Sequence, residues 1–341
     1  MANKYNIALI GCGQMGEAHI SNIYYKENVR LKYVCDTDPE RTALFARKYG
    51  ADFAETDMDK CISDPEIDIV LCATYPSSHV DILKKCIASG KHLLCEKPIG
   101  STLEEGREFA RLVKENPQIK VLVGHILRHN ETYRRAAEMI RSGAIGFPII
   151  FRMTQNHHTM NWDRYLRLLN DACPIVDCGV HYFDVMQWFS GEKIVSLDGI
   201  GMRTQEDVPD RKYNYGLATV RLSGGSIGYY EAGWTNTISS DNMKEFSGPR
   251  GRISIVYAEN RGRHHEEGDL IEYYKYPEKI YETINVNCDR KPTGAQFDHL
   301  VKMIETDAKA TPTIDEVLSS FEAAFLADEK IKEFMKNGKK N

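Results

Sequence analysis

The 341-residue chain lacks the features that mark several large classes of protein. It has no apolar run near the ~18 residues that a membrane span needs, and its nine cysteines include no CxxC pair. It also lacks a basic excess, since its formal net charge is −5, whereas nucleic-acid-binding domains usually carry many more Lys and Arg than acids. We therefore expect no membrane and no nucleic-acid partner.

The cysteines indicate where the protein works. Most lie inside apolar runs such as "YVCD", "VLCAT" and "LLCEKP", a pattern typical of reduced, buried thiols in a cytoplasmic protein rather than of a disulfide framework. The opening "NIALIG" leads straight into a glycine loop, so we expect a strand there and not a signal peptide.

The chain changes its rhythm near residue 123. Residues 1–123 alternate short apolar runs with helical patterns, which predicts an α/β Rossmann domain with a doubly wound parallel sheet. Residues 124–341 carry longer strand-like runs, a hairpin at Gly224 and Gly225, and two closing helices near 293–309 and 313–336. We expect an α+β domain with a large, mostly antiparallel sheet, tightly joined to the first.

A glycine loop follows the first predicted strand. "GCGQMG" places Gly11, Gly13 and Gly16 in GxGxxG spacing around Gln14 and Met15, directly before a helix. In that context the loop predicts a dinucleotide site, with the pyrophosphate at the helix N-terminus.

An acidic residue ends the second predicted strand. Asp36 lies 20 residues after Gly16, where a carboxylate binds the ribose hydroxyls and repels a 2′-phosphate. NAD is therefore favoured over NADP as the cofactor, although Arg41 lies close enough in sequence to weaken that preference.

"GKHLLCEKPIG" places Glu96, Lys97 and Pro98 at the end of another predicted strand. Ligands bind at this edge of open α/β sheets. A lysine there could polarise a substrate oxygen, but a lone lysine at a strand end is as often a surface residue.

"VDCGVHYFD" places Asp177, His181 and Asp184 at i, i+4 and i+7, so on one helix they would share a face. The cluster suits an acid–base site, a metal site or a buried polar group. A metal site needs at least three converging ligands, and Cys178 does not share the face, so we expect no metal.

Four motifs in this order, "GCGQMG", "ATYPSSH", "GKHLLCEKP" and "DCGVHYFD", resemble those of the Gfo/Idh/MocA oxidoreductases, and the resemblance covers nearly the whole chain. It implies a Rossmann domain followed by a domain with a large, mostly antiparallel sheet. It also implies NAD(P)-dependent oxidation or reduction of sugars, polyols or their derivatives, in a homodimer or homotetramer.

The resemblance also implies roles for single residues. Lys97, Asp177 and His181 would be catalytic: His181 exchanges the hydroxyl proton, Lys97 stabilises charge on the reacting oxygen, and Asp177 orients the ring or a substrate hydroxyl. Thr74, Tyr75, His79, Glu96 and Lys97 would join the glycine loop and Asp36 in binding the cofactor. The chain departs from the family at Tyr75, where the family often reads T-P-N, and at "DACPI", which replaces a glycine run.

The substrate is harder to predict. Polar and aromatic residues that could line a cleft are Arg128, Asn156, His157, Trp162 and Arg164. The favoured function is hydride transfer between NAD and a secondary alcohol or ketone of a sugar, cyclic polyol or glycoside. Two alternatives stay open: a glycosidase or lyase that oxidises C3 transiently and eliminates, and a non-catalytic NAD-binding sensor.

Overall fold

The protein is described here by a computed structural model, which covers residues 4–262 and 266–338. The chain forms two compact units. The first contains residues 1–126 and 291–318, and the second contains residues 127–290 and 319–341. The sequence pattern predicts that every residue after 123 belongs to the second domain. The structure differs from this prediction, because residues 291–318 belong to the first unit.

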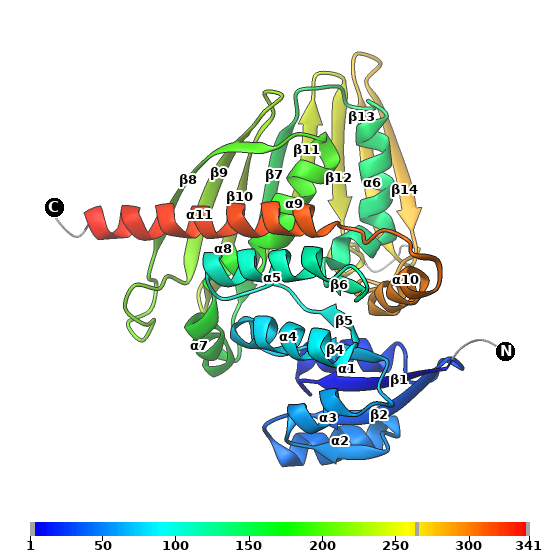
Figure 1. Cartoon of the computed structure of the whole chain (residues 1–341). Helices are drawn as coiled ribbons and strands as arrows, with labels where there is room; N and C mark the ends of the chain where they lie inside the picture. The colour runs from blue at the N-terminus through cyan, green and yellow to red at the C-terminus, as the bar shows by residue number, and fades with distance from the viewer. Residues whose placement is uncertain (1–3, 263–265, 339–341) are drawn as a thin grey trace. The chain divides into compact units, whose positions relative to one another are not determined.

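A six-stranded parallel sheet forms the centre of the first unit (Figure 1). Its order, β3-β2-β1-β4-β5-β6, is that of a doubly wound dinucleotide fold, with a switch point between β1 and β4. This confirms the predicted Rossmann architecture. The strands are β1 (Tyr5–Ile10), β2 (Val29–Cys35), β3 (Phe53–Glu55), β4 (Ile69–Cys72), β5 (His92–Cys95) and β6 (Val121–Val123).

Capping residues mark the ends of helices in the first unit, as in α2. The Asp38 side chain caps the first turn of α2 by accepting from the amides of Glu40 and Arg41, and Gly50 ends that helix in the left-handed conformation. The helices are α1 (Gln14–Ser21), α2 (Pro39–Tyr49), α3 (Met58–Ser63), α4 (His79–Ser89), α5 (Leu103–Glu115) and α10 (Thr293–Thr306), with a 3₁₀ turn η1 (Pro76–Ser78).

Helix α10 explains why the end of the chain returns to the first unit. Its apolar face buries Phe297 and Leu300 in the same core as Ile7 and Leu9 of β1 and Leu94 of β5. Burial of side chains of this size is worth about 1.5–3 kcal/mol each, so the helix is an integral part of the Rossmann core.

An eight-stranded sheet forms the second unit, in the order β14-β13-β12-β11-β7-β10-β9-β8. Only β7 and β10 pair in parallel among its described strands, which confirms the mostly antiparallel prediction. The strands are β7 (Ile150–His158), β8 (Ile194–Met202), β9 (Tyr215–Leu222), β10 (Ile227–Thr235), β11 (Lys244–Gly248), β12 (Gly251–Val256), β13 (Asp269–Lys275) and β14 (Ile280–Val286). The predicted hairpin joins β9 to β10, where Leu222 N donates to Ser226 O.

Helices pack on this sheet through aromatic side chains. Phe183 contacts Tyr230 of β10, and Phe189 contacts Phe246 of β11. The helices are α6 (Glu131–Arg141), α7 (Trp162–Asp171), α8 (Pro174–Asp177), α9 (Gly179–Ser190) and α11 (Ile314–Gly338), with 3₁₀ turns η2 (Ile126–His129) and η3 (Ala258–Asn260). Among the described residues, no helix combines the length and apolar character needed to cross a bilayer.

Candidate active site

The glycine loop joins β1 to α1 in the first unit. Gly11 has a φ of +100°, and a Cβ there would lie 2.5 Å from the Ala73 carbonyl oxygen. A Cβ at Gly16 would lie 2.0 Å from the Gly11 carbonyl oxygen, whereas one at Gly13 would meet nothing within 4 Å. The loop is therefore packed tightly at its ends and open at its centre, where a pyrophosphate can approach the first turn of α1.

The Asp36 carboxylate lies at the end of β2, beside this loop. Its Oδ2 accepts from Cys12 N at 2.8 Å and its Oδ1 accepts from Asp38 N at 3.1 Å. A third, longer contact to Oδ1 comes from the Thr37 hydroxyl at 3.5 Å. A carboxylate has about four acceptor positions, so at least one remains for a ribose hydroxyl. The exposed Arg41 guanidinium pairs with Asp38 at 3.2 Å.

The turn after β5 carries Lys97 and rests on a buried carboxylate. Glu96 is 5% exposed, and its Oε1 lies 2.6 Å from His19 Nε2 of α1. Burial alone would raise the pKa of Glu96, but the hydrogen bond with His19 and the charge of Lys97 lower it below its ordinary value of 4.5. The buried contact between Glu96 and His19 therefore joins α1 to the turn after β5. Lys97 is partly exposed at the carboxyl edge of the sheet.

The loop after β4 places its predicted cofactor residues in different surroundings. Tyr75 is 51% exposed and Thr74 is partly exposed, but His79 is fully buried. The His79 ring lies 2.8 Å from Pro98 O through Nδ1 and 3.2 Å from Thr74 O through Nε2. The buried ring therefore lies between the loops after β4 and β5, whereas Thr74 and Tyr75 are the more accessible residues of the predicted cofactor set.

The motif with Asp177 and His181 lies in the second unit and is not one helix. Helix α8 ends at Asp177, and α9 begins at Gly179. Cys178 N donates to Pro174 O and His181 N to Cys178 O. Between Ile175 and Asp184, only Asp177 and His181 keep partial exposure. The break therefore leaves these two polar side chains accessible beside a buried core.

Asp184 has a different partner. Its two carboxylate oxygens accept from Nε and Nη2 of Arg128, each at 2.7 Å. Both side chains are at least 94% buried, and the Arg128 guanidinium lies 4.7 Å from the Trp188 ring centre. This fork-to-fork ion pair favours a structural role for Arg128 over the predicted substrate contact, because both side chains are buried within the second unit.

A pocket of about 290 Å³ opens in the second unit, and the predicted residue His157 lines it. His157 Nε2 lies 3.3 Å from Gln155 Nε2, and its Nδ1 lies 3.2 Å from the Tyr165 hydroxyl. Burial lowers the pKa of His157, and the nearby Asp177 carboxylate offsets this only in part. A neutral ring fits both contacts, since one nitrogen then accepts from the Gln155 amide and the other donates to Tyr165.

The rest of the pocket wall is polar. Asn156 is buried and donates to Glu231 at 2.7 Å, while Arg290 forms an ion pair with Glu259. The pocket is also lined by His158, Ser240, Asp241, Asn242 and Asn260.

Buried Lys244 contacts Asn242 of the pocket wall. Its Nζ donates to Asn242 Oδ1 at 2.7 Å, and burial holds the pKa of Lys244 well below its usual range. Arg290 lines the pocket and Lys244 does not, and the sequence carries no local signal for either.

Two predicted substrate residues lie elsewhere. Trp162 donates its indole N–H to Asp207 Oδ2 at 2.6 Å. Arg164 is exposed, with its guanidinium 5.7 Å from the Tyr165 ring centre. Neither is among the residues that line this pocket.

Two family models match the chain, and together they span most of it. Residues 5–125 match an oxidoreductase family with an NAD-binding Rossmann fold, and residues 133–254 match the GFO/IDH/MocA C-terminal domain. The chain belongs to the Gfo/Idh/MocA oxidoreductase family. It is an enzyme that uses NAD, in agreement with the glycine loop and Asp36 described above.

Similar proteins include inositol dehydrogenases. An inositol 2-dehydrogenase of Rubrobacter xylanophilus is 26% identical over 74% of this chain and 72% of its own length. A scyllo-inositol 2-dehydrogenase (NAD(+)) of Bacillus subtilis is 27% identical over 75% of each chain. The crystal structure of an NAD-binding oxidoreductase from Klebsiella pneumoniae has the same fold, with a TM-score of 0.81 and 21% identity over 97% of each chain.

Proposed function

We propose that this Gfo/Idh/MocA oxidoreductase transfers a hydride between NAD and a secondary alcohol or ketone of a cyclic polyol or sugar. The observation that carries the proposal is the pocket beside Asp177. Side-chain amides, hydroxyls and a neutral imidazole surround it, and its charged residues include both signs. Such a wall suits a neutral ligand with many hydroxyl groups, because each hydroxyl needs both a donor and an acceptor. The names of the inositol dehydrogenase relatives point to the same class of substrate.

Three side chains carry the proposed chemistry. His181 takes the hydroxyl proton as the alcohol is oxidised and returns it during reduction, since imidazole exchanges protons near neutral pH. Lys97 donates a hydrogen bond to the reacting oxygen and stabilises the negative charge that develops there. Asp177 acts electrostatically on the pocket, as its influence on His157 illustrates. Bound NAD supplies the hydride acceptor at its nicotinamide ring.

A substrate panel tests this proposal. The purified enzyme is mixed with NAD⁺ and, one at a time, with inositol isomers, monosaccharides and glycosides, and NADH formation is followed by absorbance. We expect sustained NADH formation with at least one neutral cyclic polyol or sugar. Cleavage of a glycoside without net NADH would instead favour the oxidation–elimination route, and absence of turnover with every compound would contradict the proposal.

A further inference from the structure

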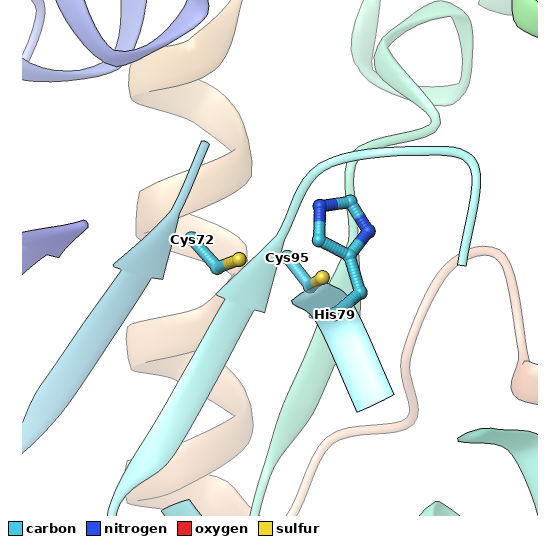
Figure 2. Close-up of side chains that lie close together, drawn as sticks. All are labelled: Cys72, His79 and Cys95. Atoms are coloured by element: carbon cyan, nitrogen blue, oxygen red, sulfur yellow. The ribbon is translucent and has the colours of Figure 1, made fainter. Parts of the chain in front are cut away.

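Three metal-ligating side chains meet beneath the loops after β4 and β5, in the first unit (Figure 2). Cys72 ends β4, Cys95 ends β5 and His79 begins α4. All three are at most 1% exposed, and one ligand atom from each lies within 4.8 Å of the other two. Cys72 and Cys95 are register partners on neighbouring parallel strands, so their side chains leave the sheet on the same side.

The two ring nitrogens of His79 each lie close to a backbone carbonyl oxygen. Nδ1 lies 2.8 Å from Pro98 O, a short distance that suits an N–H donor. In a neutral ring Nε2 then carries a lone pair, and it faces the oxygen of Thr74 at 3.2 Å. Two lone pairs at that distance repel each other unless a proton or a metal ion lies between them. Metal-ligating histidines commonly donate their second ring N–H to a backbone carbonyl, and the Pro98 oxygen lies where it would accept from Nδ1.

We propose that Cys72 Sγ, Cys95 Sγ, His79 Nε2 and the Thr74 carbonyl oxygen bind one zinc ion. Tetrahedral zinc with bonds of about 2.0–2.3 Å separates its ligand atoms by roughly 3.3–3.8 Å. The 3.2 Å between Nε2 and the Thr74 oxygen is close to that range. The ligand atoms of Cys72, His79 and Cys95 lie within 4.8 Å of one another, so shifts of about an ångström or less bring these three to the separations of a tetrahedral site.

The ligand set selects the metal. Two thiolates and an imidazole suit zinc, whereas Mg²⁺ and Ca²⁺ prefer sites made of oxygen. Two thiolate charges cancel the charge of the ion, so the complex is neutral and its burial costs little compared with that of an isolated charge. No ligand position is left for a substrate, so the ion has a structural role: it joins the ends of β4 and β5 to the start of α4. This departs from the sequence-based expectation that the chain has no metal site.

Metal content of the whole protein tests the proposal. Protein purified with zinc present and then dialysed against metal-free buffer should hold about one zinc per chain by elemental analysis. Cys95→Ala and His79→Gln should lower the ratio to below about 0.1. Cys61→Ala is the matched control, because Cys61 is an equally buried thiol of the same unit outside the cluster and should leave the ratio near one.

Cobalt substitution gives a second measurement that needs no variant. Wild-type protein loaded with Co²⁺ should show the visible bands of a tetrahedral site and a thiolate-to-cobalt charge-transfer band. A wild-type protein with neither zinc nor these bands would overturn the proposal. Thiol alkylation and mass spectrometry would then show what replaces it, either a Cys72–Cys95 disulfide or two free thiols beside a protonated His79.

Discussion

The pair formed by Arg128 and Asp184 allows a direct test of whether Arg128 supports the fold or binds substrate. Replacing Asp184 with Leu removes the carboxylate that pairs with a buried guanidinium. Removing one partner from such a buried pair typically costs about 3–5 kcal/mol. For a unit of this size, about 2–4 °C of melting temperature is lost per kcal/mol, so we expect a decrease of roughly 6–20 °C.

The double variant Arg128→Leu/Asp184→Leu is the matched control. Because neither charge then remains buried, it should recover most of the lost stability. Thermal unfolding monitored by circular dichroism measures both proteins, and KM for the best substrate is measured below the transition. A substrate-binding Arg128 would give the opposite pattern: Arg128→Leu would raise KM many-fold while the melting temperature stayed within about 2 °C of wild type. That result would refute the structural role.

Four further predictions follow from the two units. The wild-type protein should bind NAD about 10-fold or more tightly than NADP, because one charge repulsion of about 1.4 kcal/mol gives that ratio. Asp36→Ala should reduce the ratio, as calorimetry with both dinucleotides will show. Lys97→Met should lower kcat/KM by roughly 10²-fold while NAD affinity stays within a few-fold of wild type, as steady-state kinetics and calorimetry will show. The rate of alcohol oxidation should rise with pH through one ionisation. His181→Gln should slow the chemical step by about 10²- to 10⁴-fold and flatten this pH–rate profile. An unchanged pH–rate profile would show that His181 is structural. The pKa of Glu96 is lowered below 4.5 in the folded protein, so its contribution to stability is complete above pH 4.5 and is lost as the pH falls below that value. The free energy of unfolding, measured against pH in acid, should therefore fall less steeply for Glu96→Gln than for the wild type.

Local features of the active site could be predicted from the sequence. The glycine loop needs a tight turn at Gly11 and close packing at Gly16, and both requirements exclude a side chain. Such constraints act within a few residues, so the motif alone reveals them. The turn with Lys97 is of the same kind, because it follows a strand whose apolar run is plain in the sequence.

Features that depend on tertiary packing could not be predicted. The break at Cys178 is invisible in a pattern that fits a continuous helix, and the commitment of Asp184 to Arg128 depends on a partner 56 residues away. Arg290 and Asp241 lie outside the named strands and reach the pocket only through the tertiary fold of the second unit. The same holds for Cys72, His79 and Cys95, which lie at the ends of β4 and β5 and at the start of α4 and match no compact metal-binding spacing.

Deuterium transfer tests the proposed function most directly. A cyclic polyol substrate found in the panel is prepared with deuterium on every ring carbon and incubated with NAD⁺ and enzyme, and the dinucleotide is analysed by mass spectrometry. Direct hydride transfer predicts NADH heavier by one mass unit, formed in equal amount to the ketone. Unlabelled NADH, or substrate conversion in which no labelled dinucleotide accumulates, would contradict a net dehydrogenase.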